Sequence, residues 1–435
     1  MTATTPTPQW SSRFAFLMAA VGAAVGLGNL WRFPFQTGAN GGSAFVIIYF
    51  VCVVFIAYPI LMAEIAMGRA KRKSAVGSVT ALAADVGAPR LWGVLGLVGI
   101  LASYFVLTTY SMIAGQILSF SIMSFGGVFI DFQPGGTLPL YSGGVWPIVW
   151  FSVFLGITIA VVAGGLKNGV ERLVTIAMPI FFLLLLALSI YSMSTGAAGR
   201  TIDYLFSPRF SEVTPQVVLA AMGQAFYSIA VGTASMITYG AYLDRKENIA
   251  SSSGLIAGTD TMVAIVAGLM IFPVVFAFNL DPAAGMGLIF DALPPVFSGL
   301  PGGSLIGGAF FLLAFLAALT SSIIMLLVAV VFVEEWLQWP RMRVVITLGA
   351  LAWVIGVAAT VIPHLAENLD FLAGSVFLPL AAFLGAVFCG WVVPREVMRK
   401  ELANSSDGAF AIWRVMIRFV APVAVAVVMV LGLTG

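Results

Sequence analysis

Long apolar segments with few charges alternate with short polar segments along the whole chain. Eleven such segments are present, each close to the roughly 20 residues that an α-helix needs to cross a lipid bilayer. They span approximately residues 14–38, 43–68, 91–124, 146–164, 173–195, 215–242, 255–279, 303–335, 343–362, 370–393 and 412–434. The pattern predicts an all-α membrane protein of about 11 transmembrane helices, with residues 1–435 forming a single transmembrane domain.

Composition supports a membrane protein and excludes several other classes. The chain is 61% hydrophobic and 9% charged, whereas a soluble domain carries about 25% charged residues. The basic residues lie in short clusters between apolar segments, so the net charge of +2 does not indicate a nucleic-acid partner. Two cysteines and one histidine make a metal centre unexpected, and no nucleophile–base pair indicates an enzyme.

The basic clusters also predict the orientation in the membrane. When eleven spans alternate, nearly all basic residues between spans fall on one side, including Arg69 to Lys73, Arg245 and Lys246, and Arg395 to Lys400. The positive-inside rule places that side in the cytoplasm. We therefore expect a multi-pass membrane protein with a cytoplasmic N-terminus and an external C-terminus.

The first apolar segment is poorly suited to be a simple anchor. Residues 14–31 contain no charge, yet they include three glycines and Asn29, and Arg32 and Pro34 follow directly. Each glycine costs roughly 1 kcal/mol in a helix interior, and an arginine at membrane depth costs at least about 2.5 kcal/mol. Non-helical backbone at this depth is tolerated where it lines a cavity or is buried in protein. The stretch predicts a helix broken near the middle of the membrane.

A second segment repeats part of this pattern. Ala24-Val25-Gly26 in the first segment matches Ala230-Val231-Gly232 in the sixth. Glycine-interrupted spans at corresponding positions of two halves are typical of transporters built from inverted repeats. The prediction is a 5+5 inverted repeat with broken helices 1 and 6, in which repeat one covers about 14–195, repeat two covers about 215–393, and an extra helix covers about 412–434. Close helix packing through small residues is the alternative explanation for segment 6.

These motifs resemble those of the neurotransmitter:sodium symporters, in particular the bacterial sodium-dependent amino-acid transporters. The matching stretches extend over essentially the whole chain. They are Gly26 to Pro34 (GLGNLWRFP), Asn40-Gly41-Gly42, Pro59 to Arg69, Gly223 to Phe226, Leu319 to Ser322, and the pair Gly169 and Pro179.

The resemblance implies two sodium sites and no organic cofactor. Sodium needs several hard oxygen ligands, which broken helices supply as free carbonyls. The first site is implied to use Ala24, Asn29, Ser228 and Asp260. The second is implied to use Gly22, Val25, Ala317, Thr320 and Ser321.

Asp260 has a further implied role. A carboxylate within a membrane span is a functional candidate, although an interfacial helix cap is the alternative here. Chloride-using relatives have a neutral residue at this position and a serine one turn later, where this chain has Ala264. We expect Asp260 to substitute for chloride and transport to be chloride-independent.

The substrate implied by the resemblance is a zwitterionic amino acid. Amides near Leu27 and Gly28 and the Tyr110 hydroxyl would bind its carboxylate, and carbonyls near Ala24, Tyr227 and Ser228 would bind its ammonium group. Gly26 occupies the position where amine-carrying relatives have an aspartate. The side chain of the amino acid is implied to contact Val106, Tyr227, Ala230, Thr233, Ser321 and Met325. This chain departs from the commoner family pattern at Ala230, Thr233 and Ala234, so we expect a roomier or more polar pocket.

Gates are implied at both ends. Arg32 and Asp370 match the outer charged pair, with Tyr227 as a lid over the substrate, and Trp10, Tyr242 and Glu335 match parts of the inner gate. The arginine expected near the N-terminus is replaced by Thr7, for which Arg13 is a candidate substitute. Glu64 is expected to brace the broken helices by hydrogen bonds.

The sequence therefore predicts a sodium-coupled symporter that imports a neutral, hydrophobic amino acid across a lipid bilayer by alternating access. The resemblance implies that this bilayer is the bacterial inner membrane. Two alternatives remain open. One is proton coupling through Asp260 or Glu64, and the other is a ligand-gated channel or membrane amino-acid sensor.

Overall fold

The computed structural model describes residues 9–128, 144–194, 196–283, 285 and 287–434, and within them the chain forms helices and no strands. Nine helices are long and apolar enough to cross a membrane in this part of the chain. They span Ser43–Lys71, Arg90–Phe125, Trp146–Ala163, Leu166–Met193, Ile249–Ala277, Gly303–Leu337, Arg341–Val361, Leu365–Val392 and Asp407–Leu433. Each corresponds to one predicted apolar segment, which confirms the all-α membrane architecture.

Several of these spans are composite. Short π-helical turns interrupt them, so that one span carries two labelled helices. The labelled helices within the nine spans are α3 (Ser43–Cys52), α4 (Tyr58–Lys71), α6 (Val94–Phe125), α8 (Trp146–Ala163), α9 (Arg172–Met193), α13 (Ile249–Ala277), α15 (Gly303–Leu337), α16 (Arg341–Val361), α17 (Leu365–Phe371), α18 (Leu378–Val387), α20 (Asp407–Val415) and α21 (Ala421–Thr434).

The first predicted span is broken, as its glycines indicated. Helix α1 (Arg13–Ala24) begins after Ser12, whose side chain accepts from the Ala15 amide, and ends where Val25 becomes extended. A π-helical turn, Gly28–Arg32, then leads into α2 (Phe33–Ala39). The two halves are bent by 51°, and residues 21–30 are buried. The break therefore lies inside the protein, where its free backbone groups have protein partners.

The sixth predicted span is broken in the same way. Helix α11 (Pro215–Ser228) and helix α12 (Ser235–Ala241) are separated by residues 229–234. Ala230, Gly232 and Ala234 in this connection have φ values of 55°, 81° and 60°. The left-handed conformation is accessible to glycine but costs roughly 1–2 kcal/mol at each alanine. The interruption is therefore maintained by its surroundings.

Contacts from three other helices maintain this connection. The Gly232 amide donates to Oε1 of Glu64 on α4 at 2.7 Å, which is the bracing hydrogen bond predicted for Glu64. The Ser103 hydroxyl on α6 donates to the Thr233 carbonyl at 2.6 Å. A Cβ atom at Gly232 would lie 2.4 Å from the carbonyl oxygen of Leu378 on α18.

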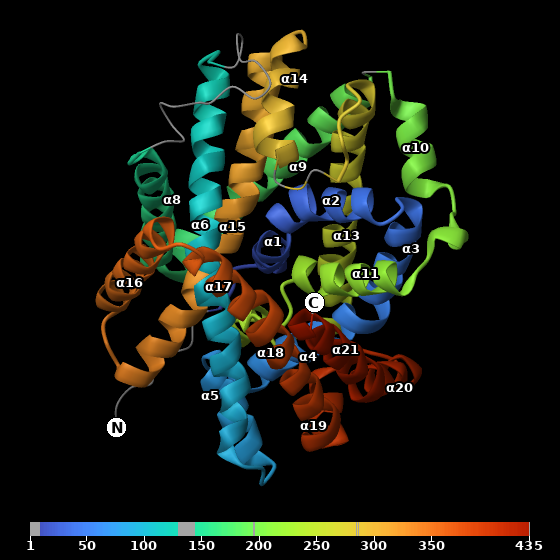
Figure 1. Ribbon diagram of the computed structural model, residues 1–435. Coiled ribbons are helices and arrows are strands. Elements are labelled where there is room, and N and C mark those ends of the chain that lie inside the picture. Colours follow the sequence, from blue (N-terminus) through green and yellow to red (C-terminus); the bar gives the residue numbers. More distant parts are fainter. Residues whose placement is uncertain (1–8, 129–143, 195, 284, 286, 435) are drawn as a thin grey trace.

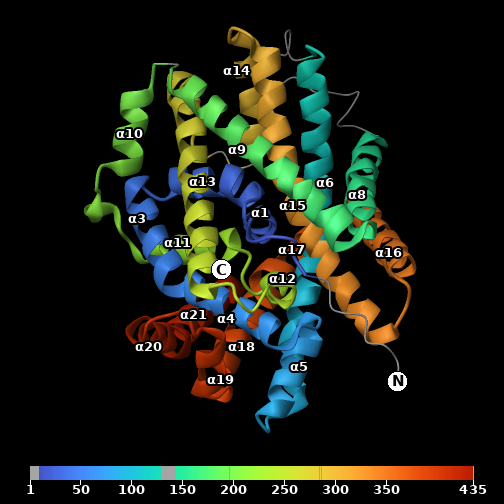
Figure 2. The same cartoon turned by 180° about the vertical axis from the view of Figure 1, so that it is seen from behind.

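The two broken spans lie at the centre of the molecule. In both views α1 lies between α13 on one side and α6 and α15 on the other (Figure 1, Figure 2). Helix α1 packs against α9, α13 and α15, and α12 packs against α4. Helices α8 and α16 lie at the periphery, which agrees with their smaller buried fractions of 28% and 33%.

The two ends of the molecule carry different short helices. One end carries α10 (Ala198–Phe206) and α14 (Leu293–Gly299), and the opposite end carries α5 (Ala75–Asp85) and α19 (Arg395–Glu401) (Figure 1). Following the orientation predicted from the basic residues, we name these the outer end and the inner end. The connections at 196–214 and 280–302 thus lie at the outer end and contain short helices, whereas residues 129–143, between α6 and α8, lie outside the described residues.

The substitution Gly232→Ala should destabilise the protein strongly. It would place a side chain at φ 81° and a Cβ atom 2.4 Å from a backbone oxygen, and we expect a loss of about 2–4 kcal/mol of unfolding free energy. Thermal unfolding in detergent measures this effect. Gly258→Ala in α13 is the control, because a Cβ atom there meets nothing within 4 Å; equal unfolding temperatures for both variants would contradict the prediction.

Candidate functional site

Four elements converge on a buried polar cluster at the break in the first span. The Asn29 amide group donates to Ser228 Oγ at 3.1 Å and to Asp260 Oδ1 at 2.8 Å. Ser228 Oγ donates to Asp260 Oδ2 at 2.6 Å, and Asn29 Oδ1 accepts from the Gly26 amide at 3.1 Å. All of these side chains are at most 1% exposed. The structure thus brings together three of the side chains predicted for the first sodium site, next to Ala24 at the end of α1.

A second polar cluster joins α15 to the carbonyl end of α1. Ser321 Oγ lies 3.3 Å from the Gly22 carbonyl oxygen and 3.4 Å from that of Val25. Ser321 and Thr320 also contact the Ala317 carbonyl, at 3.2 and 3.1 Å. The five residues predicted for the second sodium site are therefore neighbours, and each contributes a carbonyl or hydroxyl oxygen.

Between the two clusters lies the position predicted for the substrate backbone. The Leu27 amide donates to the Tyr110 hydroxyl at 3.2 Å. A Cβ atom at Gly26 would lie 2.8 Å from Ser321 Oγ and 3.0 Å from the Tyr110 oxygen, and one at Gly28 would lie 3.1 Å from the Tyr227 ring. The two glycines therefore leave room for backbone amides and hydroxyls to approach one another closely.

The region predicted for the substrate side chain is partly lined by the same helices. Val106 and Tyr110 on α6 share a cavity with Tyr227, and Met325 follows Ser321 by one turn of α15. The Thr233 hydroxyl donates to the Ala230 carbonyl at 2.5 Å and contacts Ser235 Oγ at 2.7 Å. The Thr233 hydroxyl therefore has hydrogen-bond partners in the connection between α11 and α12 and at the start of α12.

A cavity of ≈ 610 Å³ leads from the Tyr110 region toward the outer end. Its lining includes Leu27, Arg32, Tyr110, Tyr227 and Asp370. The Arg32 guanidinium lies 4.3 Å from the centroid of the Tyr227 ring, a cation–π contact. Asp370 is exposed, and among the described residues Arg32 and Asp370 form no ion pair. The predicted outer gate residues therefore line one cavity, which we call the outer vestibule.

The inner end is closed by contacts of the N-terminal segment. Trp10 donates from its indole nitrogen to the Tyr239 carbonyl at 3.2 Å and from its amide to the Tyr242 carbonyl at 3.3 Å. Glu335 instead accepts from the Ser74 amide at 2.6 Å, at the start of α5. The predicted inner gate residues thus belong to two separate contacts, and Thr7 lies outside the described residues.

Two further contacts attach this segment, and neither was predicted from the sequence. The amide and hydroxyl of Ser11 both donate to the carboxylate of Glu171, with an amide distance of 3.2 Å. Glu171 ends the π-helical turn Leu166–Glu171, which contains Gly169 of the quoted motif. Arg13 pairs with Glu247 at 3.4 Å and donates to Ser251 at 3.0 Å. Arg13 therefore connects α1 to the start of α13 through Glu247 and Ser251.

Two polar residues at the buried clusters were also missed. The Tyr49 hydroxyl lies 3.4 Å from Asp260 Oδ2 and 3.3 Å from Ser228 Oγ. Gln224 donates to the Gly28 carbonyl at 3.0 Å. Each is a hydrogen-bonding residue within an apolar run, which is the signal that could have identified it.

Two broken helices that meet at buried oxygen clusters, with a cavity open to one end, define a helical membrane transporter. The model of the Sodium:neurotransmitter symporter family matches residues 7–130 and 141–434. The chain belongs to this family. It is a sodium-dependent membrane transporter and not an enzyme.

Individual relatives agree with this assignment. The chain is 33% identical to the uncharacterized sodium-dependent transporter YhdH of Bacillus subtilis, over 97% of this chain and 96% of the relative. It is 27% identical to the mouse sodium-dependent neutral amino acid transporter B(0)AT3, over 61% of this chain and 48% of the relative. The crystal structure of MhsT in complex with L-phenylalanine matches with a TM-score of 0.89 and 38% identity, covering 97% of this chain and 99% of that chain.

Glu171→Gln should loosen the inner end. The carboxylate accepts two hydrogen bonds from Ser11, and charge-assisted hydrogen bonds contribute roughly 1.5–3 kcal/mol. We expect amide exchange in the segment from Ser11 through α1 to become about ten-fold faster, as measured by hydrogen–deuterium exchange mass spectrometry.

The matched control is Glu367→Gln at the outer end, where the carboxylate is largely exposed and contacts His364. This variant should leave exchange at the inner end unchanged. Unaltered exchange around Ser11 in Glu171→Gln would show that the contact does not hold the inner end closed.

Proposed function

We propose that the chain is a symporter that uses inward sodium flow to import a neutral, hydrophobic amino acid by alternating access, without requiring chloride. The observation that carries this proposal is the environment of Asp260. Its carboxylate is 0% exposed and contacts Asn29, Ser228 and Tyr49, and no lysine or arginine in the described part of the chain forms an ion pair with it. A buried carboxylate without a compensating charge is strongly unfavourable.

Sodium is the cation that this environment suits. The neighbouring Ser228 hydroxyl is a hard, neutral ligand of the kind that sodium prefers, and it lies 2.6 Å from the Asp260 carboxylate. The oxygens of Gly22, Val25, Ala317, Thr320 and Ser321 support a second ion, held by neutral groups alone. We therefore infer two sodium ions per transport cycle, with Asp260 also supplying the fixed negative charge that makes chloride unnecessary.

An amino-acid substrate follows from the groups beside the first cluster. The amides at Leu27 and Gly28 begin the outer half of the broken helix, where the helix dipole favours a carboxylate. The Tyr110 hydroxyl is within reach of the same position, and carbonyls at the end of α1 and α11 suit an ammonium group. Gly26 has no side chain, so the protein supplies no acidic group at this position. The carboxylate would then have to come from the substrate itself. MhsT binds L-phenylalanine, and B(0)AT3 is a neutral amino acid transporter, which supports an uncharged substrate.

The vestibule and the inner contacts support alternating access. The outer vestibule reaches Tyr110 while Trp10 packs against Tyr239 and Tyr242 at the inner end. A transport cycle then requires closure over the substrate, with approach of Arg32 and Asp370 across the vestibule, followed by release of the N-terminal segment. This proposal places the N-terminus in the cytoplasm of a bacterium and the C-terminus outside.

Three other functions make different predictions for the same measurements. Proton coupling through Asp260 or Glu64 would give concentrative uptake that follows a pH gradient without sodium. A channel would give current without stoichiometric uptake, and a sensor would bind an amino acid without transporting it. Concentrative uptake into proteoliposomes that depends on a sodium gradient separates the symporter from all three.

Asp260→Asn should weaken sodium binding by about 100-fold or more, because it removes the only charged ligand from a buried site. Sodium-dependent stabilisation against thermal unfolding measures the affinity. Asp281→Asn is a suitable control, since Asp281 is exposed in an outer connection.

Replacement of chloride by gluconate should leave uptake by the unmodified protein unchanged, and loss of uptake would refute the chloride-independent mechanism.

Tyr110→Phe should weaken amino-acid binding by about 10- to 100-fold, since one hydrogen bond to a carboxylate contributes roughly 1.5–3 kcal/mol. Scintillation-proximity binding with a panel of amino acids, with and without sodium, gives both the substrate and the effect of the variant. Sodium binding in the absence of amino acid should be retained. Unchanged substrate affinity would remove Tyr110 from the site.

A further inference from the structure

The motif Asn40-Gly41-Gly42 forms the corner between α2 and α3 and takes no part in the clusters described above. Gly41 and Gly42 have φ values of 77° and 59°. A Cβ atom at Gly41 would lie 2.6 Å from Glu212 Oε2, and one at Gly42 would lie 2.6 Å from the Tyr204 carbonyl oxygen. The two glycines are therefore needed for α10 and the turn after it to approach this corner.

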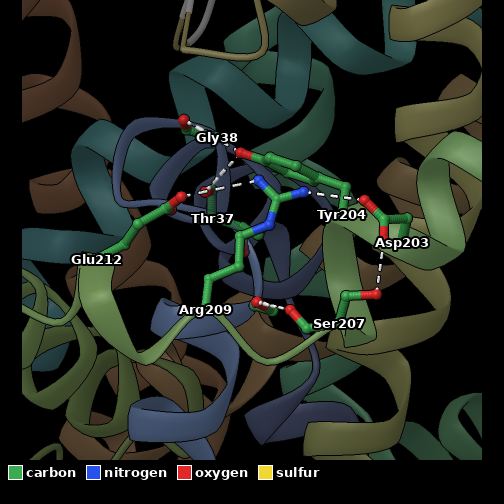
Figure 3. Close-up of polar contacts among 8 residues, drawn as sticks. Thr37, Gly38, Asp203, Tyr204, Ser207, Arg209 and Glu212 are labelled. Atoms are coloured by element: carbon green, nitrogen blue, oxygen red, sulfur yellow. Dashed lines mark hydrogen bonds and ion pairs between the residues drawn. The ribbon is translucent and has the colours of Figure 1, made fainter.

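Hydrogen bonds join α10 and the segment after it to both sides of the corner. The Tyr204 hydroxyl on α10 is shared between the carbonyls of Thr37 and Gly38, at 3.0 and 3.3 Å (Figure 3). These carbonyls belong to the last turn of α2, where helix carbonyls lack partners within the helix. The Thr37 carbonyl also accepts from the Gly42 amide at 2.9 Å, whereas the Gly38 carbonyl is reached by the Tyr204 hydroxyl. On the other side, the Ser43 hydroxyl at the start of α3 donates to the Ser207 carbonyl at 2.5 Å.

The opposite side of α10 is anchored on α13. The Tyr204 ring packs edge-on against Phe272 and Phe276, with centroid distances of 5.2 and 5.3 Å. Leu205 is 2% exposed, and a Cβ atom at Gly268 would lie 3.4 Å from its side chain. Helix α10 thus connects the carbonyl end of α2 to a long span that also supplies Asp260.

A small charge network folds residues 207–212 back onto α10 (Figure 3). Arg209 pairs with Asp203 at 3.0 Å and with Glu212 at 3.9 Å. The hydrogen bond from the Ser207 hydroxyl, together with Arg209, lowers the pKa of Asp203, so the carboxylate remains ionised at neutral pH. Exposed ion pairs contribute little individually. We therefore attribute the attachment of α2 chiefly to the half-buried Tyr204 hydroxyl.

We propose that α10 acts as a clamp that makes the outer half of the first broken span move together with α3 and α13 during the transport cycle, and that Tyr204 is its central positioning residue. Thr37 is five residues after Arg32, so the clamp fixes the short helical arm that presents Arg32 to the vestibule. This inference rests on the proposed alternating-access function. Without the hydroxyl, α2 could remain open while α3 and α13 close over the substrate.

A single reporter cysteine tests this coupling. Ser375 lines the outer vestibule, and the two native cysteines are 5% and 0% exposed, so Ser375→Cys gives a labelling signal over a low background. The protein in proteoliposomes is treated with a membrane-impermeant maleimide without sodium, with sodium, and with sodium plus L-phenylalanine. We expect sodium plus amino acid to protect the reporter when Tyr204 is present.

Tyr204→Phe is the decisive variant, because it keeps the packing against Phe272 and Phe276 and removes only the hydroxyl. We expect labelling in sodium plus L-phenylalanine to rise about five-fold, as for the loss of one hydrogen bond, while labelling in sodium alone is unchanged. Tyr191→Phe is the matched control. The Tyr191 hydroxyl also donates to a carbonyl at the outer end, that of Pro301 at 3.3 Å, but this carbonyl is not part of a broken span.

The outcomes distinguish the clamp from the proposed function. If labelling of the Ser375→Cys reporter in the protein with unchanged Tyr204 does not respond to sodium and amino acid, the proposed function is wrong. If it responds and Tyr204→Phe is protected equally well, the clamp is wrong. A lower unfolding temperature with unchanged protection would also overturn the proposal, because it would show that Tyr204 only stabilises the fold.

Discussion

The structure depends on one constraint, which is that backbone groups freed from a helix at membrane depth must find partners inside the protein. Both broken spans meet this constraint with side chains from other helices or from the break itself. Ser321 lies at the carbonyls that end α1, Asn29 accepts from the Gly26 amide, and Glu64 accepts from the Gly232 amide. The polar residues that would be liabilities in a simple membrane helix are thus the ones that make the breaks possible.

The same arrangement concentrates charge where charge is most expensive. Asp260 lies in a cluster whose other members are neutral, and the hydrogen bonds from Asn29 and Ser228 only partly offset the loss of solvation. A buried carboxylate in this position stabilises any state of the protein in which a cation lies close to it. A cation bound beside Asp260 would therefore be linked to the stability of the broken helix, because Asn29 contacts both the Asp260 carboxylate and the Gly26 amide.

How much of this could be predicted from the sequence depends on the range of each interaction. The broken first span was predictable, because its glycines, Asn29 and Arg32 are adjacent in the chain. The residues that complete its clusters were found through family resemblance, since Ser228, Asp260 and Ser321 come from distant segments that no local pattern connects.

Other contacts escaped prediction for a related reason. Ser11 and Glu171 are 160 residues apart, and each alone is an ordinary polar residue near a helix start. Tyr204 lies in a short helix between spans, where a tyrosine is unremarkable until its partners are known. Only the fold reveals that these side chains reach backbone groups of segments far away in the sequence.

The connection between α11 and α12 depends both on residues adjacent in the sequence and on contacts with distant helices. Ala230 and Ala234 hold left-handed conformations that glycine would adopt more easily, and the Thr233 hydroxyl bonds within the same connection. A Cβ atom at Gly99 of α6 would lie 2.9 Å from the Ala234 amide, so the scaffold packs directly against the strained residue. Strain held by packing limits how far a segment can adapt. Substrate choice in this chain would then be governed by the stiffness of residues 229–234 as much as by the volume of the side chains around them.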